Sequence, residues 1–458
     1  MVNDLPVVVV GAGPIGLAAA AELRERGLIP LVFERGDTAG AAIAQWNHVR
    51  VFSRWGELIA PAARRLLDTT GWTAPDADAY PTGQQWVRDY LAPLATALGD
   101  VVQLGVEVTG VARRGRDRIV DAGRDTEPLS VHVRRADGSE DRVLAQAIID
   151  ASGTWTTPNP LGGEGLAALG ESRAEVIEYR VPDLDDATVR ARYAGKHTVI
   201  AGSGHSALTA IITLAELAEQ EPGTRLSWVL RRGEVGSTFG GGDADQLPAR
   251  GALGLRAKAA VEAGLLHVVT GFRTAAIEPA ENETVVLVSD TGQRLEGVDR
   301  VVALTGFRPD LSWLSEVRLA LDPVLQAPVE LAPLIDPNVH SCGTVYPHGV
   351  RELSHPEPGV FLAGMKSYGR APTFLAMTGY EQVRSIAAAL AGDHEAAARV
   401  ELVLPETGVC GGAGVFDTAG EQASGGCCGG GGSSEPQELA LSTPVAIQDL
   451  GLTAAPAR

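Results

Sequence analysis

Two glycine-rich turns of the same kind occur in this chain, each in the same sequence setting. The first reads GAGPIG from residue 11 and follows the apolar run at residues 7–10. The second reads GSGHSA from residue 202 and follows the apolar run at residues 199–201. Each turn stands between a predicted strand and a predicted apolar helix. One such turn is a weak signal, but two in the same setting predict a protein that holds two dinucleotide cofactors.

The glycines in such a turn have separate physical tasks. The first makes a tight turn, the second lets the main chain approach a pyrophosphate, and the third position lets the helix pack closely on the strand. The N–H groups that begin the helix then face the phosphates, and the helix dipole favours their charge. We therefore predict that the cofactors contact Gly11, Gly13, Pro14, Ile15 and Gly16 in the first turn, and Gly202, Ser203, Gly204, His205 and Ser206 in the second.

The next strand after each turn predicts which cofactor binds there. The first of these strands, at residues 30–33, ends at Glu34. A carboxylate at this point accepts hydrogen bonds from ribose hydroxyls and repels a 2′-phosphate, which favours FAD or NAD. The second strand ends at Arg231 and Arg232, and guanidinium groups bind phosphate in a bidentate manner. NADPH is therefore expected in the second site, although two solvated arginines at a strand end are the ordinary alternative.

The composition argues against several classes of protein. The chain has 458 residues and a formal net charge of −19, which disfavours binding to nucleic acid or to an anionic membrane. No run of eighteen apolar residues suggests a membrane span. The first strand begins close to Met1 and leaves no room for a signal peptide, so we expect a cytoplasmic location. Four cysteines, none before Cys342, do not make a disulfide framework.

The order of predicted elements repeats along the chain. Each unit reads strand, glycine turn, helix, strand, β-meander and a final strand. We therefore expect an α/β fold with two Rossmann-like dinucleotide-binding domains, the NADP domain being inserted in the FAD domain. The expected boundaries are 1–158 for the first part of the FAD domain, 159–325 for the NADP domain, 326–405 for the return segment of the FAD domain, and 406–458 for a flexible tail rich in glycine.

Further segments carry a family resemblance. Residues 150–155 (DASGTW) and 304–310 (LTGFRPD), together with the two glycine turns, resemble flavoproteins with two dinucleotide-binding domains. That group includes flavin-containing monooxygenases and thioredoxin reductases. The resemblance covers roughly residues 5–400 and implies FAD together with NAD(P)H. It extends the set of expected cofactor contacts to Ser152, Gly153, Gly306, Gly364 and Met365.

A narrower resemblance and two departures accompany this match. Residues 80–83 (YPTG) and 364–374 look like the flavoprotein of bacterial arsenic-resistance operons. However, residues 160–196 contain neither the Phe nor the His of the flavin monooxygenase signature. In addition, Met365 stands where relatives usually carry an Asp that contacts the flavin ribityl or phosphate. Lys366, Ser367 or main-chain groups would then replace that Asp.

The thiols that usually relay electrons from a flavin are missing from the expected positions. No Cys lies between Glu34 and Tyr80, and none lies in the predicted NADP domain. Of the four cysteines, the tail holds Cys410 and the adjacent pair Cys427 and Cys428. Thiolates bind soft metals and metalloids, so this pair is a candidate for chelating trivalent arsenic, and it is similar to the tail pair of mercuric reductase. Incidental cysteines in a low-complexity tail are the alternative.

These observations lead to one main functional expectation. We expect a FAD-dependent NADPH oxidoreductase, monooxygenase-like, that acts on an arsenical or another thiophilic small molecule, with reductase and monooxygenase branches both open. A non-enzymatic metalloid-binding or redox-sensing flavoprotein is the alternative. The expected partner is a small-molecule substrate, without nucleic acid, membrane or bound metal, and a homodimer is left open. Catalytic candidates are Tyr368, Arg370, Cys427 and Cys428, and further cofactor contacts are Arg35 and Trp55.

Overall fold

The computed structural model of the protein describes residues 4–245, 247–339, 348–372 and 374–402. The predicted tail, residues 406–458, lies outside these ranges. So do all four cysteines, including the catalytic candidates Cys427 and Cys428. Within the described ranges, none of the helices combines the length and the apolar character needed to cross a membrane.

The first sheet has five parallel strands in the order β16-β7-β1-β2-β3. Its central strand β1 is buried along its whole length and pairs with β2 on one side and β7 on the other. Strands covered on both faces read as continuous apolar runs, which is why residues 7–10 are four valines. The strands are β1 (Val7–Val10), β2 (Pro30–Glu34), β3 (Val102–Leu104), β7 (Ala147–Asp150) and β16 (Val360–Leu362).

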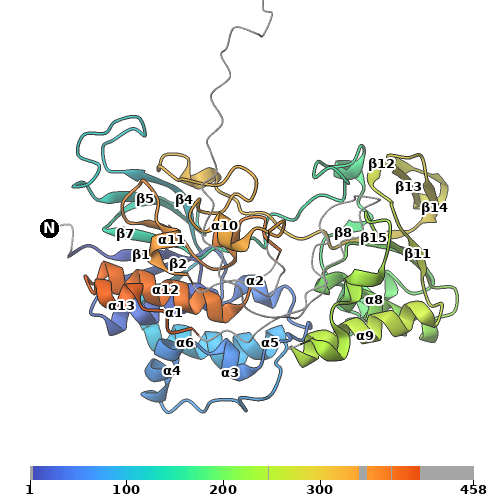
Figure 1. The fold of residues 1–458 in the computed structure, drawn as a ribbon, viewed down its shortest axis with the longest axis horizontal. Coiled ribbons are helices and arrows are strands. Elements are labelled where there is room, and N and C mark those ends of the chain that lie inside the picture. The colour runs from blue at the N-terminus through green and yellow to red at the C-terminus, as the bar shows by residue number, and fades with distance from the viewer. Residues whose placement is uncertain (1–3, 246, 340–347, 373, 403–458) are drawn as a thin grey trace, which may run out of the picture. The chain divides into compact units, whose positions relative to one another are not determined.

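Alternate side chains of β1 enter two different cores. Val7 and Val9 pack against the helical layer, whereas Val8 and Val10 pack against an antiparallel three-stranded sheet. Figure 1 shows this layering around the first sheet. The helices are α1 (Pro14–Glu25), α2 (Ala41–Ala44), α3 (Trp55–Leu58), α4 (Pro61–Asp68), α5 (Gly83–Trp86), α6 (Ala92–Leu98), α10 (Ala332–Ile335), α11 (Val350–Leu353), α12 (Ala376–Leu390) and α13 (His394–Ala398), and the antiparallel strands are β4 (Val106–Arg113), β5 (Leu129–Arg135) and β6 (Glu140–Ala145).

The second sheet repeats this plan with the order β11-β10-β9-β15-β8. Ile200 and Val302 pack against helices, and Val199 and Ala201 pack against a second antiparallel sheet. The parallel strands are β8 (Ile177–Glu178), β9 (His197–Ala201), β10 (Arg225–Val229), β11 (His267–Val269) and β15 (Arg300–Ala303), the helices are α7 (Ala187–Ala191), α8 (His205–Gln220) and α9 (Pro248–Glu262), and the antiparallel strands are β12 (Thr274–Pro279), β13 (Val285–Ser289) and β14 (Arg294–Val298).

The chain returns to the first sheet after it has completed the second. Strand β16 pairs in parallel with β7, with Leu362 opposite Asp150. The predicted α/β class with two dinucleotide-binding units is therefore confirmed, and the return segment contributes a strand to the first unit. The residue numbers of the domain boundaries stay predictions.

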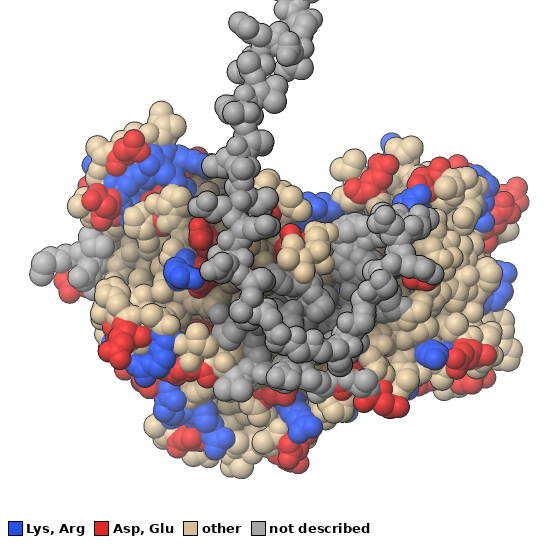
Figure 2. All heavy atoms as spheres, in the orientation of Figure 1, with Lys and Arg blue, Asp and Glu red and all other residues tan. Residues whose placement is uncertain are grey.

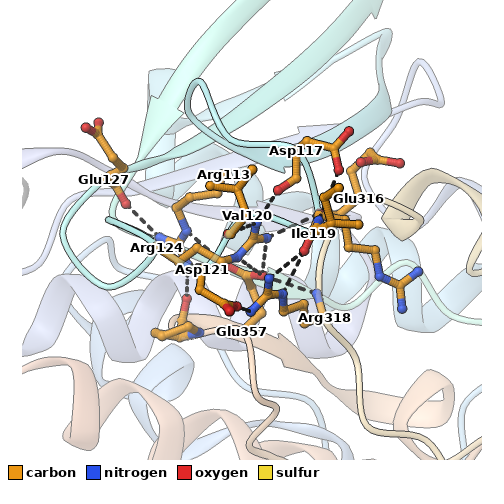
Figure 3. Close-up of polar contacts among 12 residues, drawn as sticks. Arg113, Asp117, Ile119, Val120, Asp121, Arg124, Glu127, Glu316, Arg318 and Glu357 are labelled. Carbon is orange, nitrogen blue, oxygen red and sulfur yellow. Dashed lines mark hydrogen bonds and ion pairs between the residues drawn. The ribbon is translucent and has the colours of Figure 1, made fainter.

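A buried cluster of charged side chains joins β4 and the loop after it to Glu357, which precedes β16 (Figure 3). The carboxylate of Glu357 accepts hydrogen bonds from Arg113 Nε at 2.9 Å and Arg124 Nη2 at 2.6 Å, and from the main-chain N–H of Arg318 at 3.2 Å. Burial alone would raise the pKa of Glu357, but its bonds to Arg124 and Arg113 outweigh burial and lower it. The cluster joins three segments that are far apart in the sequence, and removing one of its charges would leave the others buried without a full set of partners.

Charged side chains on the molecular surface are mixed in sign. Figure 2 shows acidic and basic residues in small interspersed groups over the face that it draws. Ion pairs near the surface include Arg65 with Glu25 and Arg134 with Glu107. Exposed pairs of this kind contribute little to stability, about 0–1 kcal/mol each.

One buried carboxyl group makes stability depend on pH. Glu22 on α1 is 6% exposed, and its nearest cation, Arg26 Nη2, lies 3.8 Å away. Burial raises the pKa of Glu22 from 4.5 to about 7, and Arg26 opposes this only in part. Between these two values the folded protein holds a proton that the unfolded chain has released. The free energy of unfolding therefore falls as pH rises through this window.

The Glu22→Gln variant tests this effect. We expect it to be more stable than the wild type by on the order of 3 kcal/mol at pH 8, and by less than about 1 kcal/mol at pH 5. Thermal unfolding at both pH values is the measurement. Glu219→Gln, at an exposed position of α8, is the control and should show no such dependence. An equal gain at pH 5 and pH 8 would contradict the argument.

Candidate functional site: two dinucleotide turns

The first glycine turn is built so tightly that two of its positions accept only glycine. Gly11 has a φ of +97°, and a Cβ there would lie 2.9 Å from the carbonyl oxygen of Ala151. A Cβ at Gly16 would lie 1.9 Å from the carbonyl oxygen of Gly11. The turn, the helix that follows it and the end of β7 therefore touch through main-chain atoms, as the predicted roles of the first and third glycines require.

The middle glycine is different because it faces open space. A Cβ on Gly13 would meet no atom within 4 Å, and the φ of Gly13, −81°, is one that any residue adopts. The protein itself therefore does not require glycine at this position. Gly13 caps α1, and no side chain caps the helix start. Pro14 is the first helical residue, and Ile15 is only 8% exposed. Free helical N–H groups beside open space fit the phosphates of a dinucleotide.

The second turn has the same construction. Gly202 has a φ of +127°, and a Cβ there would lie 2.2 Å from the carbonyl oxygen of Leu304. A Cβ on Gly204 would meet nothing within 4 Å, and Gly204 caps α8 without a capping side chain. The third position is Ala207, which is fully buried. Ser203 is half-buried and Ser206 is exposed at this turn.

The predicted ribose-binding acid lies beside the first turn. One carboxylate oxygen of Glu34 accepts a hydrogen bond from the N–H of Ala12, and the other accepts from the N–H of Gly36, both at 2.8 Å. These two bonds hold the carboxylate at the end of β2, next to the glycine turn. Each oxygen keeps a further lone pair for another donor.

The equivalent place in the second unit holds no acid. Val10 pairs with Phe33 in the first sheet and Ala201 pairs with Val229 in the second, so Leu230 stands where Glu34 stands. Leu230 is buried, and Arg231 and Arg232 follow it. Strand β10 ends at Val229, one residue before the predicted end at Leu230. The exposed Arg231 side chain is bonded to the carbonyl oxygen of Gly163 at 3.4 Å.

His205, the first residue of α8, contacts the first unit. Its ring lies 5.1 Å from the ring of Phe52, measured between centroids. Burial lowers the pKa of His205 to about 4, and the nearby Arg250 adds to this shift. The imidazole is therefore neutral at neutral pH and brings no charge to the second turn.

In the loop after β16, neither side chain that was expected to replace the usual Asp faces outward. Lys366 and Ser367, the side chains predicted to replace the usual Asp, both turn into the protein. Lys366 Nζ is 2.7 Å from Asp150 Oδ2, and Ser367 Oγ donates to the carbonyl oxygen of Gly364. The N–H of Gly364 is bonded to the buried side chain of Gln382. Met365 itself is half-buried.

Two predicted aromatic residues are enclosed by the protein. Trp55 is 4% exposed and belongs to the core of the first unit. Tyr368 is 1% exposed, and its ring packs edge-on against Phe374 and near His348. Burial raises the pKa of the Tyr368 hydroxyl far above its ordinary value. Both side chains are placed for packing, and Tyr368 is not accessible to a substrate in this arrangement.

The remaining predicted site residues lie at or near the surface. Arg35 is 3.9 Å from Glu107, and Arg370 Nε is bonded to the side-chain oxygen of Gln326 at 2.9 Å. Ser152, Gly153 and Gly306 follow the carboxyl ends of β7 and β15, the ends at which such sheets bind their ligands.

Sequence reasoning missed residues that the fold brings to these turns. Three of these contacts join residues that are far apart in the sequence: Phe52 with His205, Asp150 with Lys366, and Gln382 with Gly364. Only Asp150 carried a local signal, because a charged residue that ends a buried apolar strand needs a partner.

Comparison with known proteins places this geometry in a family. The chain is 28% identical over 208 residues to indole-3-pyruvate monooxygenase YUCCA1 of Oryza sativa subsp. japonica, a match that covers 45% of this chain and 44% of that one. It is 32% identical over 218 residues to glycine oxidase of Pseudomonas aeruginosa, covering 36% of this chain and 58% of that one. The chain thus spans about half the length of the curated relatives it matches.

Solved structures share the fold at low sequence identity. Bacillithiol disulfide reductase of Bacillus cereus aligns with a TM-score of 0.62 and 20% identity, covering 85% of this chain and 99% of that one. The cadaverine monooxygenase DfoA of Erwinia amylovora, solved bound to FAD, aligns with a TM-score of 0.60 and 12% identity, covering 92% and 100%. A flavin-containing monooxygenase of Stenotrophomonas maltophilia aligns with a TM-score of 0.53 and 22% identity, covering 85% and 98%.

The family model described as pyridine nucleotide-disulphide oxidoreductase matches residues 8–329, which include both glycine turns and both parallel sheets apart from β16. The predicted oxidoreductase with two dinucleotide cofactors is thereby confirmed at the level of the family. Because the match spans more than half of the chain, this protein belongs to the pyridine nucleotide-disulphide oxidoreductase family.

Proposed function

We propose that this protein is a FAD-dependent NADPH oxidoreductase that acts on a small molecule. The observation that carries the proposal is the pair of helix-capping glycines, Gly13 and Gly204, each open to the outside of its turn. Their neighbours are held by main-chain contacts, so each turn leaves room for a pyrophosphate on its open side.

The first turn suits FAD. Glu34, held by the N–H groups of Ala12 and Gly36, would accept the ribose hydroxyls of the adenosine. The N–H groups at the start of α1 would bind the pyrophosphate. FAD, when bound, supplies the redox chemistry by accepting a hydride from the nicotinamide.

The second turn suits NADPH better than NADH. Leu230 takes the place of the ribose-binding acid, so no carboxylate there repels a 2′-phosphate. Arg231 and Arg232 follow directly and supply the guanidinium groups that bind phosphate. His205 stays neutral beside this turn, so the attraction for the cofactor rests on the helix start and the arginines.

The substrate we propose is an arsenical or another thiophilic small molecule, and the favoured reaction is oxygen-dependent oxidation. The segments at residues 80–83 and 364–374 support the arsenical, through their likeness to the flavoprotein of arsenic-resistance operons. The monooxygenases among the relatives and neighbours support the reaction type. Cys427 and Cys428 are proposed as thiol ligands of the substrate, and they lie outside the described residues.

A pair of glycine variants separates the two sites. Gly13→Ala and Gly204→Ala add a methyl group that meets no protein atom, so FAD-free samples should unfold at the wild-type temperature. We expect Gly13→Ala to lose FAD and Gly204→Ala to keep FAD but lose NADPH, each by about tenfold or more in Kd. Visible absorbance and NADPH titration are the measurements. Retention of both cofactors by both variants would rule out these turns as the phosphate sites.

The preference for NADPH is tested at the arginines. Arg231→Ala with Arg232→Ala should raise the KM for NADPH by about tenfold or more, because a phosphate loses its guanidinium partners, and should leave the KM for NADH nearly unchanged. Steady-state oxidation of each nucleotide is the measurement. An equal effect on the two nucleotides would refute the assignment.

The reaction itself is tested with trivalent arsenicals. We expect methylated or inorganic trivalent arsenic to increase the rate of NADPH oxidation above the background. Oxygen consumption, measured with an oxygen electrode, should rise in proportion to NADPH oxidation. The same rate under anaerobic conditions would instead identify a reductase. No increase with any thiophilic substrate would contradict the proposed substrate class.

A further inference from the structure

A fully buried ion pair stands beside the first glycine turn. Asp150 is the last residue of β7 and is 0% exposed, and Lys366 lies in the short helix η9 (Gly364–Tyr368) and is 1% exposed. Lys366 Nζ lies 2.7 Å from Asp150 Oδ2. The other side of the ammonium group faces the ring of Trp313, at 4.9 Å from its centroid. Nothing in the proposed reaction uses this pair directly.

The ion pair also binds the hydroxyl group of a third residue, Ser152. Ser152 Oγ donates to Asp150 Oδ1 at 2.6 Å and accepts from Lys366 Nζ at 3.0 Å. The main-chain N–H of Ser152 also donates to Asp150 Oδ1, at 3.1 Å. Ser152 is exposed, whereas both of its charged partners are not. The buried charges therefore fix the position of a segment that reaches the surface.

Ala151 and Ser152 form the main-chain surface that the first glycine turn contacts. A Cβ at Gly11 would lie 2.9 Å from the carbonyl oxygen of Ala151 and 3.0 Å from Cα of Ser152. A displacement of Ala151 or Ser152 by a few tenths of an ångström would reach the turn directly, because no side chain lies between them. The ion pair thus connects to the turn through the hydroxyl group of Ser152 and then through main-chain contacts of Ala151 and Ser152 with Gly11.

The second unit provides an internal comparison. Val10 pairs with Asp150, and Ala201 pairs with Ala303, so Ala303 occupies the place of Asp150. The second turn contacts the main chain of Leu304, and the next hydroxyl, Thr305 Oγ1, donates to the carbonyl oxygen of Asn159 rather than to a charged group. Among the described residues, the ionic arrangement occurs at the first turn and not at its counterpart.

This difference needs a physical reason, because burying two charges is costly. A buried ion pair contributes little to stability compared with well-packed apolar residues of the same volume. It does give directional, charge-assisted hydrogen bonds that hold a main-chain segment in one geometry. The ammonium is already neutralised by Asp150, so its task is to position Ser152 rather than to bind phosphate itself.

We propose that Asp150 and Lys366 are positioning residues that hold residues 151–153 in the geometry in which the first turn retains FAD. The second turn, which lacks the pair, releases and rebinds NADPH in every catalytic cycle. This inference rests on the proposed binding of FAD at Gly13 and of NADPH at Gly204.

The test removes the pair without leaving one charge unpaired. Asp150→Asn combined with Lys366→Met in the full chain should raise the Kd for FAD by about tenfold or more and leave the Kd for NADPH within about twofold of the wild type. FAD-free protein is titrated with FAD, and quenching of flavin fluorescence reports binding. The visible spectrum of the bound flavin should also change shape, which a loss of stability alone would not cause.

The control and a second variant keep the outcome decisive. Thr305→Ala removes the corresponding hydroxyl of the second unit and should leave the Kd for FAD unchanged. Ser152→Ala keeps the ion pair and its packing, so it tests the link even if the double variant fails to fold, and it should also weaken FAD. An unchanged Kd for FAD in Ser152→Ala overturns the proposal, as does a double variant in which both cofactors weaken equally. Failure of the wild type to bind FAD at all would instead refute the proposed function.

Discussion

The structure depends on a main-chain contact that leaves no room for a side chain. At each glycine turn, the chain leaving the central strand of a parallel sheet touches the end of a neighbouring strand, Ala151 for Gly11 and Leu304 for Gly202. This contact determines where the next helix begins and which way its free N–H groups point. The layers on both faces of each sheet then keep the strands, and hence the contact, in place.

The two units share one plan, and the differences between them lie at the strand ends. A carboxylate stands after β2 and a buried leucine followed by arginines stands after β10. A buried ion pair ends β7, and an alanine stands at its counterpart on β15. Each of these differences changes the charge at the carboxyl edge of a sheet, which is where ligands bind in such folds. The interiors of the strands are apolar in both units.

The local sequence predicted the geometry of both turns. The helix-capping positions of Gly13 and Gly204 follow from turns of six residues, and the place of Glu34 follows from the end of one strand, whereas the contacts of these residues with cofactors stay predictions. Trp55 and Tyr368 were expected near the flavin, and in this structure protein atoms cover both of them. An aromatic residue in a sequence shows that it will be covered, but not whether protein or cofactor will cover it.

The sequence by itself determined the two-unit α/β plan, the positions of both glycine turns and the difference in charge between the strand ends that follow them, because short local patterns specify all of these features. Only the tertiary structure decided which distant residues complete each turn. It brought Lys366 to Asp150, Gln382 to Gly364 and Phe52 to His205. These contacts arise from the packing of strands and helices that are far apart in the chain, and no local pattern specifies such packing.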